Sequence, residues 1–135
     1  MEDACLDSDA LIDAYDLGIE KFNGVHTTYI SLYEFLRGLA YLGKSIAGYK
    51  AYLESNLEVI PLDNKAITLA SSVYAQLRKK GTLVDDPDLL IACMCITRGL
   101  PIVTGNVKHF ERFREFGLSL RPKDDFLAAA GEGQR

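Results

Sequence analysis

Short apolar runs alternate along this chain with longer segments in which apolar and polar residues recur at helical spacing. The short runs predict strands at residues 4–6, 27–30, 58–62 and 118–121, and residues 101–106 predict a further short strand that breaks into a turn. The longer segments predict helices at residues 9–17, 31–42, 46–55, 63–80, 87–98 and 108–115. Glycines follow most of these helices, as expected for residues that end them. The alternation of strands and helices indicates an α/β fold in which helices cover both faces of a mostly parallel sheet.

The composition is that of a single globular domain with a substantial core. The chain has 135 residues, of which 48% are hydrophobic and 25% charged. We expect the domain to span residues 1–127 and the last residues, 128–135, to form a frayed tail. The longest apolar region, residues 29–42, is interrupted by Glu34 and Arg37, so no membrane span is predicted. The acidic start of the chain lacks the basic region of a secretory signal, and we expect a cytoplasmic protein.

The charge and the small number of metal-binding side chains limit the chemistry. A net charge of -4 argues against a dedicated basic surface for nucleic acids, but it leaves room for an enzyme whose acidic centre holds a metal. The chain has two histidines, too few for a histidine-based zinc site, and its three cysteines show no metal or redox spacing. We expect Cys5, Cys93 and Cys95 to be buried thiols. Any metal would therefore be held mainly by oxygen ligands.

Two polar residues, Asp7 and Asn106, directly follow predicted strands. Sites of parallel α/β folds form at the carboxyl ends of the strands, so both residues are expected at one edge of the sheet. Asp7 could be a helix N-cap, a role that Ser8 or Asp9 could also fill, or it could bind a metal. Asn106 could supply a permissive turn after its strand, or it could orient a water or a carboxylate. The local sequence leaves both alternatives open.

Glu34 lies in the predicted helix that contains SLYEFLRGL. Ser31 and Glu34 have the spacing of a capping box, in which the glutamate reaches back to the first residue of the helix. Arg37 is spaced for a helical ion pair with Glu34. The apolar neighbours predict a mostly buried helix, in which a charge needs a partner. A structural role and a functional role are both compatible with this pattern.

Three carboxylates precede an apolar helix in the segment VDDPDLLIACM. Proline is favoured at the first helical position, so Pro87 predicts Asp86 as the N-cap and Asp88 as a residue of the first turn. Asp85 would then lie in solvent. The cap does not need the Asp88 side chain, and the helix behind it is apolar nearly all round and should be deeply packed. Of the three acids, Asp88 is therefore the best placed to face a functional site.

Together and in this order, four segments resemble the motifs of the PIN-domain nucleases, and especially those of the VapC toxins of VapBC toxin–antitoxin pairs. The segments are LDSDALID, SLYEFLRG, DLLIAC and GLPIVTGNVKHF, and the resemblance covers residues 3–122. It implies a PIN-like three-layer α/β/α sandwich around a mostly parallel sheet of about four to five strands. It also implies an acidic catalytic centre of Asp7, Glu34 and Asp88, with Asn106 in the fourth position.

The resemblance implies a metal-dependent endoribonuclease. Three carboxylates that converge without a cationic neighbour repel one another, and oxygen ligands suit Mg²⁺ or Mn²⁺. The implied reaction is hydrolysis of single-stranded or structured RNA, which leaves 5′-phosphate and 3′-hydroxyl ends. Lys108, His109 and Arg112 follow the last motif and could contact the RNA, although a solvated helix face would explain them equally well. The implied partners are a small VapB-like antitoxin, which the apolar helices 31–42 and 46–53 could contact, and a second copy of the chain.

Two positions depart from the family pattern and leave room for other functions. Asn106 replaces an aspartate, which removes a negative charge, and His109 stands where many members have aspartate. A catalytically weak PIN-like module that binds RNA or protein is therefore one alternative. A haloacid-dehalogenase-like phosphatase is another, because it also begins with a strand and Asp-x-Asp, and VDDPD resembles its later acidic pair. That family places its Thr or Ser motif before the acidic pair, however, whereas Thr104 follows it here.

Overall fold

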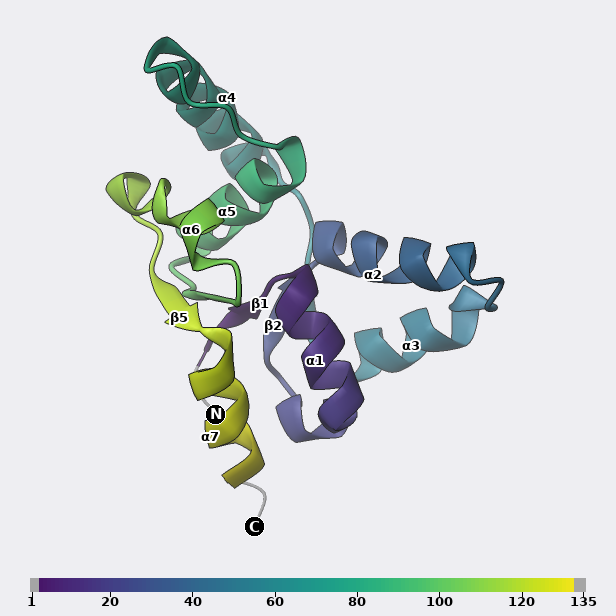
Figure 1. Cartoon of the computed structure of the whole chain (residues 1–135). Helices are drawn as coiled ribbons and strands as arrows, with labels where there is room; N and C mark the ends of the chain where they lie inside the picture. The colour runs from purple at the N-terminus through teal and green to yellow at the C-terminus, as the bar shows by residue number, and fades with distance from the viewer. Residues whose placement is uncertain (1–2, 133–135) are drawn as a thin grey trace.

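The computed structural model describes residues 3–132 and contains a five-stranded parallel sheet between two layers of helices (Figure 1). The strands are β1 (Cys5–Leu6), β2 (His26–Thr28), β3 (Glu58–Ile60), β4 (Ile102–Thr104) and β5 (Leu120–Pro122). All four strand pairings are parallel, and the order across the sheet is β3-β2-β1-β4-β5. The expected α/β sandwich with a parallel central sheet is confirmed, and the first strand of the chain lies in its middle.

Seven helices and two 3₁₀ turns surround this sheet. They are α1 (Ser8–Gly18), η1 (Ile19–Phe22), α2 (Tyr29–Tyr41), α3 (Ile46–Asn56), α4 (Asn64–Lys79), α5 (Asp86–Arg98), α6 (Val107–Glu111), η2 (Arg114–Phe116) and α7 (Lys123–Glu132), as the described residues show. The helices α1, α2, α3 and α7 pack on one face of the sheet, and α4, α5 and α6 pack on the other. In Figure 1, α2 and α3 form a hairpin that extends away from the sheet.

The core consists of two apolar clusters, one on each face of the sheet. Successive strand residues point to opposite faces, so Leu6 and Val103 pack beneath α1 and α2, whereas Cys5 and Ile102 pack against α4 and α5. The helix α5 is deeply buried, as its apolar sequence predicts, and all three cysteines are free and buried. The central sheet is therefore covered on both faces, which leaves the ends of the strands as the places where polar chemistry can occur.

The end of the chain differs from the expected frayed tail. A helix, α7, follows β5 directly and continues to Glu132, because Phe126, Leu127 and Ala130 are buried in the cluster on the α1 face. Residues 133–135 lie outside the described residues. The predicted helix at 108–115 is divided into α6 and η2. Within residues 3–132, no helix is both long and apolar enough to cross a membrane.

Candidate active site

The residues that directly follow the parallel strands meet at one edge of the sheet. Asp7 follows β1, Tyr29 follows β2, and Lys123 follows β5. The turn at Gly105 and Asn106 follows β4, which pairs with β1. The prediction that Asp7 and Asn106 share an edge is therefore confirmed.

Asp7 is a buried helix cap with negative neighbours. Its side chain, at the N-cap of α1, accepts a hydrogen bond from the Ala10 N–H at 2.8 Å, and the residue is only 5% exposed. Burial raises the pKa of the Asp7 carboxyl to about 6, against the opposing effect of hydrogen bonds from Thr104 and Ala10. The charges of Asp9 and Asp88 contribute smaller increases to this pKa. Asp7 thus has the N-cap role that the sequence allowed, and the carboxylates of Asp9 and Asp88 lie near enough to act on it.

Glu34 reaches the same edge from α2, where its partner is Ser8. The Ser8 hydroxyl, next in sequence to Asp7, donates a hydrogen bond to the Glu34 carboxylate. The predicted ion pair with Arg37 is present, with 3.5 Å between Nη2 and Oε2. The predicted capping box is wrong, because β2 runs directly into α2 and the helix begins earlier. Thr28 is the N-cap, and its hydroxyl accepts the hydrogen bond from the Ser31 N–H at 3.0 Å.

The start of α5 places Asp88 toward the site. Asp88 lies in the first turn of the helix and is close enough to Asp7 to raise its pKa. Oδ2 of Asp88 lies 3.3 Å from Nδ1 of His109, which α6 presents. The expectation that Asp88 is the best placed of the three acids therefore agrees with the geometry.

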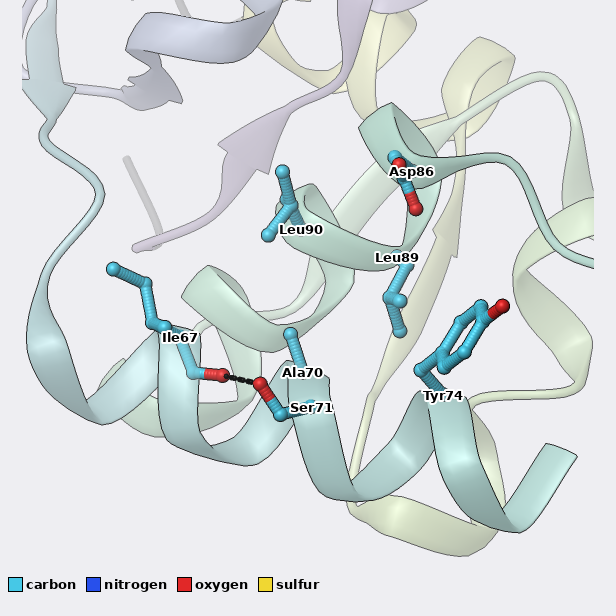
Figure 2. Close-up of a pocket in the computed structure, with 7 residues that line it drawn as sticks. All are labelled: Ile67, Ala70, Ser71, Tyr74, Asp86, Leu89 and Leu90. Carbon is cyan, nitrogen blue, oxygen red and sulfur yellow. Dashed lines mark hydrogen bonds between the residues drawn. The ribbon is translucent and has the colours of Figure 1, made fainter. Parts of the chain in front are cut away.

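The predicted cap at Asp86 is wrong. The helix begins at Asp86, Asp85 occupies the N-cap position, and its side chain makes no capping hydrogen bond. Proline tolerates either of the first helical positions, because its missing N–H would be unpaired at both. Asp85 is exposed, as expected. Asp86 instead lines a pocket of about 400 Å³ between α4 and α5, in which Leu89 and Leu90 face side chains of α4 (Figure 2).

The turn after β4 is held from both sides. The Thr104 hydroxyl, which is buried, accepts a hydrogen bond from the Asn106 N–H at 2.8 Å. The Gly105 N–H donates to Oδ2 of Asp9 at 3.2 Å. Asn106 occupies the N-cap position of α6, but its side chain makes no capping hydrogen bond. Its amide group is therefore not used in starting the helix.

The three basic residues expected to contact RNA have different surroundings. Lys108 and His109 are exposed on α6. Arg112 is partly buried, and its Nη1 donates a hydrogen bond to the Leu83 carbonyl at 2.6 Å. A cavity of about 100 Å³ lies between this loop and α6, and Asp88, His109 and Arg112 are among its lining residues. Arg112 thus has a structural role in holding the loop before α5.

The acidic residues provide oxygen ligands at one edge of the sheet, but they do not form a closed cage. Among residues 3–132, no three acidic, histidine or cysteine side chains converge closely enough to surround a metal ion. The donor chemistry nevertheless fits a hard divalent cation, because the charges that act on the Asp7 pKa are both negative. Mg²⁺ usually keeps several waters and binds one or two carboxylates directly, so it does not require three converging ligands.

Sequence reasoning missed three residues of this edge. Ser8 and Thr104 looked like ordinary cap and strand residues, and only the fold shows that they contact Glu34 and Asp7. Lys123 was overlooked because the last helix was not predicted. The rule that nominated Asp7 and Asn106 could have found it, since Lys123 also follows a parallel strand.

Comparisons with known proteins identify the family of the chain and relatives of its fold. The family model of the PIN domain matches residues 4–115. The chain is 36% identical over 124 residues to Ribonuclease VapC1 of Methanocaldococcus jannaschii. The aligned region covers 87% of this chain and 86% of the relative. It is 30% identical over 112 residues to a VapC ribonuclease of Pyrococcus furiosus, covering 83% of this chain and 74% of the relative. The crystal structure of DNA-bound VapBC from Salmonella typhimurium is similar in fold, with a TM-score of 0.66 and 27% identity over 91% of this chain and 99% of that chain.

Proposed function

Because the chain belongs to the PIN-domain family and its relatives are VapC ribonucleases, we propose that it is a VapC-type endoribonuclease that requires a divalent metal. Family membership removes the phosphatase alternative. The proposed reaction is hydrolysis of RNA phosphodiester bonds, with Asp7, Glu34, Asp88 and Asn106 as the catalytic group. The proposed products carry 5′-phosphate and 3′-hydroxyl ends, and the proposed substrate would place the activity in the cytoplasm.

The observation that carries the proposal is the environment of Asp7. An ionised carboxylate that is buried beside two other acids is unfavourable, and the raised pKa of Asp7 expresses that cost. A bound divalent cation would offset it. We propose Mg²⁺ or Mn²⁺ as the cation, held by Asp7 and Asp88 together with Glu34. When bound, it would supply positive charge for the phosphate and for the charge that develops during hydrolysis.

The chain's own residues would keep this centre in order. The Ala10 N–H and the Thr104 hydroxyl hold the Asp7 carboxylate, and the Ser8 hydroxyl holds that of Glu34. These contacts fix the direction in which each carboxylate presents its remaining oxygen. The Asn106 amide, which the helix cap does not use, would orient the attacking water or the phosphate.

The substrate would approach over α6. Lys108 and His109 are exposed there, and His109 lies beside Asp88, so both would contact RNA near the scissile phosphate. Arg112 would act mainly by holding the loop before α5 through the Leu83 carbonyl. The proposed substrates are single-stranded or structured RNA, including tRNA, rRNA and mRNA.

A VapB-like antitoxin and a second copy of the chain are the proposed partners. The Salmonella relative was solved as a VapBC assembly, which supports the antitoxin. The hairpin of α2 and α3 exposes large side chains that suit an apolar partner: Tyr33 is 60% exposed, Tyr41 90% and Leu42 69%. The antitoxin would therefore cover this hairpin.

The decisive experiment is cleavage of end-labelled RNA by the purified chain. Single-stranded and folded RNAs are each incubated with Mg²⁺, with Mn²⁺ or with a chelator. We expect cleavage that depends on the metal and is lost in Asp7→Asn and Asp88→Asn. Asp86→Asn is the matched control, since it makes the same chemical change two residues from Asp88 and should cleave normally.

Two results would reject the proposal. A folded protein that neither binds Mg²⁺ nor cleaves any RNA would indicate a binding module without catalysis. In cells, expression of the chain alone should arrest growth, and expression of its antitoxin should relieve the arrest; unchanged growth at confirmed expression would argue against a toxin.

A further inference from the structure

The last helix begins with a lysine that is bound to two acids. Nζ of Lys123 lies 2.7 Å from Oδ2 of Asp13 and 3.1 Å from Oδ2 of Asp9. The Lys123 side chain is only 18% exposed, although the two carboxylates are 41% and 48% exposed. Hydrogen bonds with Asp13 and Asp9 raise the pKa of Lys123 above its ordinary value, so the amine is charged at neutral pH. An exposed ion pair contributes little to the free energy of unfolding, but the side chain of Lys123 is largely enclosed.

Asp9 connects this ion pair to the turn after β4. The same Oδ2 atom that contacts Lys123 accepts the hydrogen bond from the Gly105 N–H. The approach is so close that a Cβ atom at Gly105 would overlap the Asp9 carboxylate and lie 3.1 Å from Cε of Lys123. A side chain at this position would therefore displace the Asp9 carboxylate from its contact with the turn. The turn rests directly on the pair of Asp9 and Lys123.

The turn carries Asn106 of the proposed catalytic centre and also Thr104, which contacts Asp7 of that centre. Thr104, at its start, hydrogen-bonds to Asp7 and accepts the N–H of Asn106. A shift of Gly105 would therefore displace contacts to Asp7 and to Asn106 together.

Lys123 is itself fixed by the fold. It follows β5, whose register pairs Pro122 with Thr104, so the lysine begins its helix beside the turn. Behind it, Phe126, Leu127 and Ala130 anchor α7 in the core. Lys123 lies beyond residues 4–115, where the family model matches.

We propose that Lys123 and Asp9 form a positioning pair that holds the turn of residues 104–106 against the acidic centre. Lys123 keeps the Asp9 carboxylate directed at the Gly105 N–H. Neither residue need touch RNA. This inference rests on the proposed ribonuclease function for its effect on activity, but its effect on the turn can be measured separately.

The first test is kinetic and compares Lys123→Met, Lys123→Arg and Lys80→Met. We expect Lys123→Met to lower kcat about 10- to 100-fold with little change in KM for RNA, as for residues that orient catalytic groups. Lys123→Arg should recover most of the activity. Lys80→Met is the matched control, because it removes an exposed lysine whose Nζ lies 2.8 Å from Oε1 of Glu115, and its kcat should be unchanged.

The second test measures hydrogen exchange of the Gly105 amide in the metal-free protein by NMR. Lys123→Met and Asp9→Asn should each speed this exchange, and the double variant should exchange no faster than Asp9→Asn, because both changes break one unit. Lys80→Met should leave the rate unchanged. If Lys123→Met does not fold, Asp9→Asn and Lys123→Gln provide the same comparison.

The outcomes separate the two proposals. Unchanged Gly105 exchange in Lys123→Met and Asp9→Asn would overturn the positioning pair, whatever the activity. Faster exchange in these two variants, together with a wild-type chain that cleaves no RNA, would support the pair and reject the ribonuclease. Faster exchange with unchanged kcat would show that the turn does not matter for catalysis and would overturn the role given to Lys123.

Discussion

Two aspartates of this chain have the same local task and opposite surroundings. Asp7 caps α1 by accepting the Ala10 N–H at 2.8 Å, and Asp63 caps α4 by accepting the Ala66 N–H at 3.0 Å. Asp63 is half-exposed and paired with Arg98, whose Nη2 lies 3.3 Å away. Asp7 is buried, and the neighbouring charges that act on its pKa are negative. The hydrogen bond explains the aspartate in both places, but only at Asp63 do the surroundings also satisfy its charge.

The largest effect expected from this comparison is on catalysis. Asp7→Asn keeps an oxygen that can accept the Ala10 N–H but removes the negative charge, so RNA cleavage should fall by more than about 100-fold, beyond the loss typical of residues around a metal ligand. Asp63→Asn makes the same change at a cap and should cleave normally. Equal activity in the two variants would place the site elsewhere.

The second effect is on the pH dependence of stability without metal. Because the pKa of Asp7 is raised to about 6, the folded state holds the proton more tightly than the unfolded chain. The contribution of Asp7 to the free energy of unfolding should therefore fall as the pH rises from about 4 to about 6, by about 3 kcal/mol at 1.4 kcal/mol per pKa unit.

Urea unfolding at several pH values can isolate this contribution. Asp7→Asn should lack the fall, and at neutral pH it should be more stable than the wild type. Asp63→Asn should retain it. A wild-type and an Asp7→Asn curve that run parallel through this window would contradict the assigned pKa.

A smaller effect is expected where the cap is only structural. Asp63→Ala removes the hydrogen bond to Ala66 and the partner of Arg98, and it should lower the free energy of unfolding by about 1 kcal/mol without changing cleavage. Thermal or urea unfolding beside an activity assay would measure both. A loss of activity that exceeds the loss of folded protein would mean that Asp63 also serves the site.

The smallest effect is expected at Asp86. Asp86 is the first residue of the helix and does not occupy the N-cap position, so Asp86→Asn should change the free energy of unfolding by less than about 0.5 kcal/mol and leave cleavage intact. A loss of about 1 kcal/mol would restore the role as cap that the position of Pro87 suggested.

The sequence patterns predicted what depends on neighbours along the chain. Apolar runs predicted the five strands, and the rule about strand ends placed Asp7 and Asn106 at one edge of the sheet. The capping box predicted at Ser31 is wrong because β2 runs directly into α2 with no loop between them. Residue spacing along the chain cannot show where the preceding strand ends. The partner of Glu34 is Ser8, which lies 26 residues away, and no periodicity relates the two.

The last helix shows the same limit. Its apolar face is short and consists of Phe126, Leu127 and Ala130. These residues pack in the core beside η1, and this packing stabilises the helix. Isolated helices of this length are marginal, and tertiary packing supplies the stability. Because this helix was not predicted, Lys123 was not identified as a residue of the site. Its partners, Asp9 and Asp13, lie more than 100 residues earlier in the chain.

The central place of β1 has a consequence for a chain that is still being synthesised. β1 and its neighbour β2 are synthesised before β4, which is the other neighbour of β1 and pairs Ile102 with Cys5. Until β4 emerges, the growing polypeptide lacks two of the five strands, β4 and β5, and it also lacks Asn106. A nascent chain that lacks β4 cannot assemble the acidic edge. The order of translation therefore delays the acidic edge until β4 has been synthesised.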